Sequence, residues 1–247
     1  MSTEERESTL WDSLGHEWIK LPCAAMREVG PAAQTLGGLL RISVKPTFVE
    51  TARIVASARL PLSSVRRHLS ILEAGGWIEN RGRQPTRSGR CRRTNTIAVT
   101  KKTRDAIEPY GFLPWWACCS IRGVGRLRWG MKAVLSIVMG RLLTLRAVVE
   151  QNEMDAEEEP DGNVVTRERF GFKLRLLEEH TGLSRHTIIV AKRHLQRLGI
   201  VEWSGGGRRE DGGSMPDLLV PRSDFRIIET PASPGKVYID FGIVEGG

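Results

Sequence analysis

The sequence predicts a mainly helical α+β protein in which two similar units, each with a small β-hairpin, follow one another. Three observations lead to this expectation. Two segments align without gaps at an offset of 123 residues, which places Leu60 on Leu183. Each segment has apolar residues at helical spacing, then a glycine, then short β-like runs. The length of 247 residues is enough for two small domains.

The aligned segments run from Phe48 to Asn80 and from Gly171 to Trp203. Identity between them is low, but apolar and glycine positions agree, which is typical of two copies of one architecture. The matched pairs are Leu60 with Leu183, Ser64 with Thr187, Val65 with Ile188, Leu72 with Leu195, Gly76 with Gly199, and Glu79 with Glu202.

Each copy is expected to contain a short helix, a turn and a second helix. The turn residue, N-cap and terminal glycine are Pro61, Ser63 and Gly75–Gly76 in the first copy, and Gly182, Ser184 and Gly199 in the second.

The second helix of each copy has an apolar stripe, which predicts its buried face. The stripe is Val65, Leu69 and Leu72 in the first copy, and Ile188, Ala191, Leu195 and Leu198 in the second. Two β-like runs after each helix predict a hairpin. They cover 77–79 and 94–100 in the first copy, and 200–202 and 225–229 in the second.

Residues 109–130 lie between the copies and contain Trp115 and Trp116. Such an apolar segment predicts a packed connector, and an exposed partner-binding patch is the alternative. Residues 131–151 have helical periodicity and predict the first helix of the second copy. Acidic residues then cluster over 150–162, which predicts a solvated loop that stays away from a polyanionic partner. A segment that mimics such a polyanion and inhibits its binding is the alternative.

The order of helix, turn, helix and hairpin resembles the winged helix-turn-helix family, as in bacterial regulators and plasmid replication initiators. The resemblance rests on PTFVETARIVASARLPLSSVRRHLSILEAGGWIENRG and RRTNTIAVT in the first copy, and on TGLSRHTI in the second. It covers about 18–102 and, more loosely, 129–229. It implies that the second helix of each copy enters the major groove and that the hairpin, or wing, contacts the DNA backbone. Winged helices that dock on proteins are the alternative.

The resulting domain plan has five parts. They are a polar N-terminal tail (1–17), a first winged helix-turn-helix domain (18–108), the connector (109–130), a second such domain (131–229) with the acidic insert 150–162, and a C-terminal tail or strand (230–247).

The helix faces opposite the apolar stripes predict the DNA-contacting residues, because about 100° separates successive side chains. In the first copy they are Ser63, Ser64, Arg66, Arg67 and Ser70, and in the second Arg185, His186, Thr187, Ile189, Arg193 and Arg197. Charged helix faces that are merely solvated are the alternative.

The predicted wing of the first copy carries the strongest charge signal. Residues 81–104 contain nine basic residues and no acidic one: Arg81, Arg83, Arg87, Arg90, Arg92, Arg93, Lys101, Lys102 and Arg104. Such a segment either stays solvated or meets a polyanion. The wing of the second copy has Arg208 and Arg209, but Glu210 and Asp211 follow them directly.

The chain as a whole is basic, with 37 Lys+Arg against 29 Asp+Glu and a net charge of +8. We find no phosphate-binding loop, zinc motif or nucleophile motif, so we expect no enzymatic activity, metal or cofactor. The sequence therefore predicts a cytoplasmic, nucleoid-associated protein that binds double-stranded DNA and regulates transcription. A replication initiator and a docking scaffold are the alternatives. A homodimer is compatible with each, and we expect neither membrane insertion nor a small-molecule effector.

Overall fold

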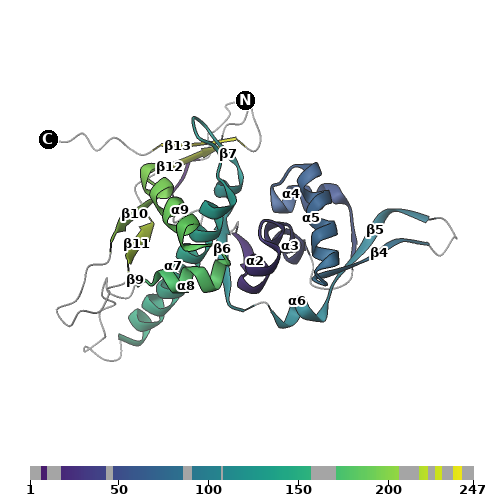
Figure 1. The fold of residues 1–247 in the computed structure, drawn as a ribbon, viewed down its shortest axis with the longest axis horizontal. Coiled ribbons are helices and arrows are strands. Elements are labelled where there is room, and N and C mark those ends of the chain that lie inside the picture. Colours follow the sequence, from purple (N-terminus) through teal and green to yellow (C-terminus); the bar gives the residue numbers. More distant parts are fainter. Residues whose placement is uncertain are drawn as a thin grey trace.

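The structure is a computed structural model that describes residues 7–9, 18–42, 47–85, 91–106, 108–156, 171–205, 217–221, 226–229 and 236–240. Within these residues the chain is a mixed α and β protein with four small sheets (Figure 1). The predicted α+β class is correct. No helix in the described ranges has both the length and the apolar composition that crossing a bilayer requires.

The first unit comprises residues 32–99 and has its elements in the order α3 (Ala32–Ile42), β3 (Thr47–Val49), α4 (Thr51–Ala58), α5 (Leu62–Ala74), β4 (Ile78–Pro85) and β5 (Cys91–Val99). Its sheet is antiparallel with the order β3-β5-β4. The first strand therefore pairs with the last one, and α3, α4 and α5 pack against one another beside the sheet.

The second unit comprises residues 129–221 and repeats this plan with α7 (Trp129–Ala156), β9 (Gly171–Phe172), α8 (Leu174–Thr181), α9 (Arg185–Arg197), β10 (Val201–Ser204) and β11 (Asp217–Pro221). Its sheet order is β10-β11-β9, so the first strand again pairs with the last. The registers agree as well. Val49 pairs with Asn95 in the first unit, and Phe172, which is 123 residues after Val49, pairs with Asp217 in the second.

The repeat extends to single backbone hydrogen bonds. Arg59 and Gly182, which are 123 residues apart, both end a helix in the left-handed conformation, with φ of 51° and 68°. The amide of Trp77 donates to the carbonyl of Leu72 at 2.8 Å, and that of Ile200 donates to Leu195 at 3.0 Å. The 123-residue offset found in the sequence therefore describes a repeated backbone.

A prediction follows from comparing Gly182 with Gly76. Both have positive φ (68° and 69°), which costs a non-glycine residue about 1–2 kcal/mol. A Cβ on Gly182 would lie 2.7 Å from the Cα of Arg27 in α2 (Cys23–Val29), whereas a Cβ on Gly76 would meet nothing within 4 Å. In urea unfolding, Gly182→Ala should therefore lose clearly more stability than Gly76→Ala. Equal losses would contradict the close α2–α8 packing.

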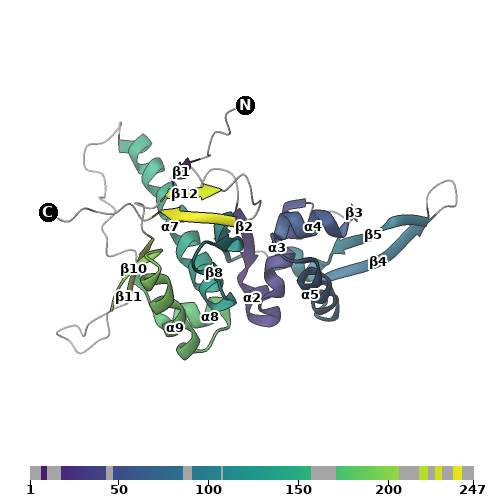
Figure 2. The same cartoon turned by 90° about the horizontal axis from the view of Figure 1, so that it is seen from above.

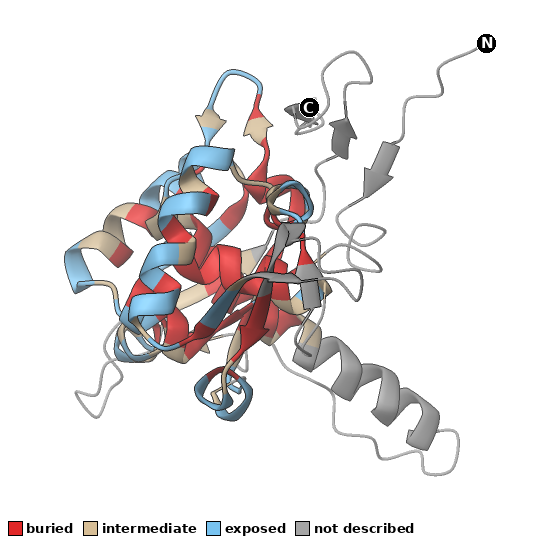
Figure 3. Ribbon diagram, turned by 90° about the vertical axis from the view of Figure 1, so that its right-hand side faces the viewer, coloured by how far each residue is buried: buried red, intermediate tan, exposed pale blue. Residues whose placement is uncertain are grey.

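The connector is packed, as predicted. Strand β6 (Tyr110–Pro114) pairs with β2 (Trp18–Pro22) along its whole length and lies against α7. The 3-10 helix η1 (Trp115–Cys118) follows β6, and its Trp116 is fully buried. Helix α6 (Lys101–Asp105) precedes β6. One hydrophobic cluster includes residues of both units and of the connector, and Figure 3 shows the buried residues at the centre of the described part.

The ends of the chain correct two predictions. Strands β1 (Glu7–Thr9), β12 (Arg226–Glu229), β13 (Lys236–Asp240), β7 (Ser120–Ile121) and β8 (Gly125–Arg126) form one sheet in this order. The predicted tail 1–17 therefore contains a strand. Residues 226–229 of the predicted run 225–229 pair with β1 and β13 instead of closing the second hairpin, and residue 225 lies outside the described residues. Strand β11 takes that place because its Leu219 is buried and its Asp217 pairs with Lys192 of α9.

Two helix boundaries also differ from the prediction. Helix α5 begins at Leu62 with Pro61 at its N-cap position and no side-chain cap, so Ser63 is not the cap. Proline supplies a fixed φ there without a side-chain hydrogen bond. Helix α7 begins at Trp129 and continues to Ala156, so the first part of the predicted acidic loop 150–162 is helical. The remaining part lies outside the described residues.

Candidate nucleic-acid interface

Helix α5 presents a basic, polar face to solvent. Its Val65, His68 and Leu72 are buried, and the opposite side carries the predicted contact residues. Ser63, Arg66, Arg67 and Ser70 are exposed, and Ser64 is half-buried. The helix face that was predicted to point outward is therefore exposed to solvent.

His68 is a buried residue of α5 that the apolar pattern missed. Its Nδ1 lies 2.9 Å from Oγ1 of Thr35 on α3. The residue lies three positions after Val65 and four before Leu72, so helical spacing alone places it on the buried face. Burial lowers the pKa of His68 below the usual 6.5, and the positive charges of Arg67 and Lys132 lower it further.

A pH dependence follows from this burial. The pKa of His180 on α8 is also lowered from 6.5, first by burial and then by Arg27. Below pH 6.5 the unfolded chain therefore binds more protons than the folded chain, and stability decreases as pH falls through the two folded-state pKa values. The double variant H68Q/H180Q should show a flatter decrease in its urea midpoint over this range. An unchanged pH profile would contradict the assignment.

The hairpin formed by β4 and β5 projects away from the body of the first unit, beyond α5, in both Figure 1 and Figure 2. Arg81 is exposed and pairs with Glu79 at 3.0 Å. Arg83 lies in β4, and Arg92 and Arg93 lie in β5. Arg87 and Arg90 fall outside the described residues, as do Arg208 and Arg209 of the second hairpin.

Not every basic residue of the 81–104 segment is available to a ligand. Lys102 pairs with Glu28, donates to the carbonyl of Gly75 at 2.9 Å and lies 4.7 Å from the centre of the Trp77 ring. These contacts attach α6 to the base of the hairpin. Lys102 therefore has a structural role.

Helix α9 repeats the arrangement of α5. Ser184 is the N-cap as predicted, and its hydroxyl accepts a hydrogen bond from the amide of Thr187 at 3.3 Å. Ile188, Ala191 and Leu195 are buried as predicted, but Leu198 is only half-buried. Among the predicted contact residues, Arg185, His186, Arg193 and Arg197 are exposed, whereas Thr187 and Ile189 are half-buried.

Lys192 is a buried cation on α9 that the sequence analysis did not single out. It is 1% exposed, pairs with Asp217 of β11 and lies 4.7 Å from the centre of the Trp203 ring. The pair connects the helix to the last strand of its own unit. Only the fold brings the two residues together, because 25 positions separate them in the chain.

The two exposed helix faces differ in chemistry at equivalent positions. Ser63 corresponds to His186, Arg66 to Ile189 and Ser70 to Arg193 at the 123-residue offset. The arginines of α5 lie in its first half, whereas α9 has Arg185 at its first residue and Arg193 and Arg197 in its second half. In Figure 2 both helices lie on the lower side of the molecule, with α8 and α2 between them.

The electrostatics of these faces favour an anionic partner. Arg66, Arg67, Arg193 and Arg197 are all exposed, and none forms an ion pair with another described residue. Guanidinium groups at such positions can donate two hydrogen bonds to phosphate or to the O6 and N7 atoms of guanine.

The described residues contain no group of three His, Cys, Asp or Glu side chains placed to hold a metal ion. Cys23, Cys118 and Cys119 have buried side chains. Burial raises the pKa of Cys23 to about 11 and that of Cys118 to about 12, so both are protonated at neutral pH.

Comparison with known proteins identifies no family. No family model matches the chain, and no curated protein is similar to it. A search of solved structures finds the DIP2311 protein from Corynebacterium diphtheriae, at 16% identity and a TM-score of 0.19. The match covers 82% of this chain, which spans 28% of that protein. A likeness of this size supports no conclusion about fold or function.

Proposed function

We propose that this protein binds double-stranded DNA in a sequence-specific manner through two winged helix-turn-helix units, and that it regulates transcription at its binding site. In this proposal α5 and α9 are the recognition helices, and the β4–β5 and β10–β11 hairpins are the wings. The topology supports the assignment, because each unit has the order helix, strand, helix, helix, strand, strand and pairs its first strand with its last.

The observation that carries the proposal is the position of the basic residues of the first unit. The projecting β4–β5 hairpin carries six of the nine basic residues of segment 81–104 and lies beside α5, whose Arg66 and Arg67 are exposed. A helix in the major groove and a basic hairpin on the adjacent backbone would together contact one side of a duplex. The second unit has less basic character in its hairpin and would contribute mainly through α9.

The salt dependence of binding tests the role of the hairpin. Each phosphate contact contributes a slope of about −0.9 in a plot of log affinity against log salt concentration. The triple variant R90A/R92A/R93A should therefore lower the slope by about one unit per lost contact, measured by fluorescence anisotropy with a random duplex. An unchanged slope would show that this hairpin does not contact DNA.

Selection of bound sequences from random duplexes tests specificity. Because the exposed faces of α5 and α9 differ, we expect an enriched site with two unlike halves. No enrichment combined with no salt-dependent affinity would overturn the proposal in favour of protein docking. The genomic position of the enriched site separates two roles: a palindrome or single site in a promoter indicates regulation, and iterated copies indicate replication initiation.

A further inference from the structure

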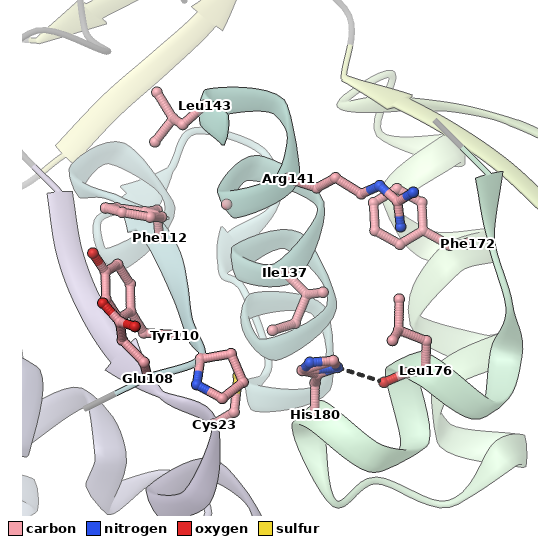
Figure 4. A pocket seen from close by; sticks show the side chains of 12 residues that line it. Cys23, Glu108, Tyr110, Phe112, Ile137, Arg141, Leu143, Phe172, Leu176 and His180 are labelled. Atoms are coloured by element: carbon pink, nitrogen blue, oxygen red, sulfur yellow. Dashed lines mark hydrogen bonds between the residues drawn. The ribbon is translucent and has the colours of Figure 1, made fainter. Parts of the chain in front are cut away.

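An open cleft of about 800 Å³ separates helix α8 of the second unit from strand β6 of the connector. Figure 4 shows Tyr110 and Phe112 on one wall and Phe172 and His180 on the other, with Ile137 of α7 between them. Because side-chain packing is interrupted by the cleft, its walls do not hold each other in place. Contacts outside the cleft therefore position the two helix-turn-helix segments relative to each other.

The turn between the two helices of each unit provides such contacts. In the second unit the turn residue Gly182 lies so close to α2 that a Cβ would be 2.7 Å from the Cα of Arg27. In the first unit the equivalent residue, 123 positions earlier, is Arg59, and its side chain contacts η1 and Cys119 of the connector. Each turn residue lies three positions before the next helix, since α5 begins at residue 62 and α9 at residue 185. The turn contacts therefore determine where α5 and α9 begin.

The side chain of Arg59 makes two contacts with the connector. Its guanidinium carbon lies 4.9 Å from the centre of the Trp115 ring, within the range of a cation–π contact. Its Nη1 donates a long, weak hydrogen bond of 4.0 Å to Sγ of Cys119. Trp115 and Cys119 are both buried, so the surface that receives Arg59 is fixed by the core.

A buried hydrogen-bond chain beside Arg59 links the same helix end to the second unit. The carbonyl oxygen of Ala58 accepts from Nε2 of Gln34 on α3 at 2.7 Å, and Oε1 of Gln34 accepts from Nζ of Lys132 on α7 at 3.1 Å. Gln34 and Lys132 are both buried. The end of α4 is therefore linked to α7 through Gln34 and to the connector through Arg59.

The backbone of Arg59 is strained. Among the described residues, Arg59 is the one non-glycine residue with a positive φ, with φ of 51° and ψ of 45°. Glycine adopts this conformation without a steric penalty, and Gly182 occupies the equivalent position. Strain of this kind persists where surrounding contacts impose it, and it is concentrated at functional positions. The contacts of the Arg59 side chain with Trp115 and Cys119 offset the strain that a glycine would avoid.

We propose that Arg59 is a positioning residue that sets the separation and orientation of α5 and α9 by holding the turn of the first unit on the connector. Its consequence for DNA rests on the proposed function. With the turn held, binding of one helix to its half of the site places the other helix at the second half. Without the guanidinium, each helix still contacts its own half, but the two binding events are coupled less strongly.

Pulsed electron paramagnetic resonance on the full chain tests this positioning without DNA. Spin labels on Ser70→Cys and Arg193→Cys, which are exposed and equivalent positions of α5 and α9, report the distance between the helices. A Cys91→Ser background confines labelling to the introduced thiols. We expect a narrow distance distribution with Arg59 present and a broader or displaced one for Arg59→Gly and Arg59→Gln. Arg59→Lys should keep it narrow, because an ammonium can also lie over the Trp115 ring.

Two comparisons separate positioning from charge and from stability. Arg53→Ala removes an exposed charge from the same helix and should leave the distribution unchanged. In urea unfolding, R59G should be more stable than R59Q, because glycine relieves the strain. R59G therefore decides the question even if R59Q does not fold. An R59G distribution like that of the parent, an R59K distribution as broad as that of R59Q, or an equal change in R53A would each overturn the proposal.

DNA binding tests the consequence. Fluorescence anisotropy would compare the selected site with duplexes that contain only one of its halves. R59G should bind the full site at least about threefold more weakly than the wild type, with unchanged affinity for each half, because the coupling alone is reduced. A changed distance distribution with unchanged full-site affinity overturns the consequence for DNA alone. Absence of DNA binding by the wild type overturns the proposed function alone, since the distance measurement does not use DNA.

Discussion

Replacing Arg66 and Arg67 together with alanine should weaken binding to the selected DNA site on the order of 30-fold or more. A good bidentate arginine contact to a base provides about 1–3 kcal/mol of discrimination, and tenfold corresponds to about 1.4 kcal/mol. Both side chains are exposed on α5, opposite the buried Val65 and Leu72. The fold should therefore be unaffected, with an unfolding free energy within about 0.5 kcal/mol of wild type.

The matched control for this variant removes the same charge elsewhere. Arg41→Ala and Arg128→Ala together also delete two exposed arginines, but neither lies on α5 or on the hairpins. Fluorescence anisotropy with the selected site and with a scrambled duplex measures both affinities. We expect R66A/R67A to lower the ratio of specific to scrambled affinity, and the control to lower both affinities slightly and equally. Equal effects of the two variants would show that α5 contributes only non-specific electrostatic attraction to DNA.

Asp217→Ala should be among the most destabilising single substitutions in the described part of the chain, at about 3–5 kcal/mol. Removing one partner of a buried ion pair leaves the other charge without compensation in a low-dielectric site. Lys192 is 1% exposed, and its contacts are the Asp217 carboxylate and the Trp203 ring. Urea unfolding followed by far-UV circular dichroism measures the loss.

The first unit supplies the control for this experiment. At the positions equivalent to Lys192 and Asp217 it has Leu69 and Asn95, given the 123-residue offset and the matched strand registers. The double variant K192L/D217N copies that pair and removes both charges, so no buried charge is left without a partner. It should therefore recover most of the stability that D217A loses. A second comparison is Glu79→Ala, which breaks the exposed Arg81–Glu79 pair and should cost at most about 1 kcal/mol. A loss for D217A as small as that for E79A would show that Lys192 reaches solvent.

The local pattern of the sequence was sufficient for the two helix-turn-helix segments and for the exposed faces of α5 and α9. The 123-residue repeat is visible because apolar residues and glycines recur at the same positions. Apolar residues form the buried face of a helix, and glycines end it. Gly76 and Gly199 end their helices at positive φ, and Ser184 caps α9 as its side-chain chemistry favours. The same pattern missed His68, although its spacing from Val65 and Leu72 places it on the buried face.

The pairing of distant segments could not be predicted in this way. The run 225–229 has the composition of a hairpin strand, but β11 pairs with β10 because Leu219 fills the core and Asp217 compensates Lys192. Strand β1 pairs with β12, although more than two hundred residues separate the two strands in the sequence. Strand composition indicates that a segment can pair, and only the complete set of buried contacts decides its partner.

The sequence by itself therefore determined that the chain contains one plan twice, that α5 and α9 turn arginines outward, and that the hairpin of the first unit is strongly basic. These are local properties, set by side-chain periodicity and charge. The tertiary structure alone decided which strand completes the second unit, how β2 and β6 join the units into a common core, and that an open cleft lies between β6, α7 and α8. These features depend on contacts between residues far apart in the chain, whose free energy is gained only when the whole core packs.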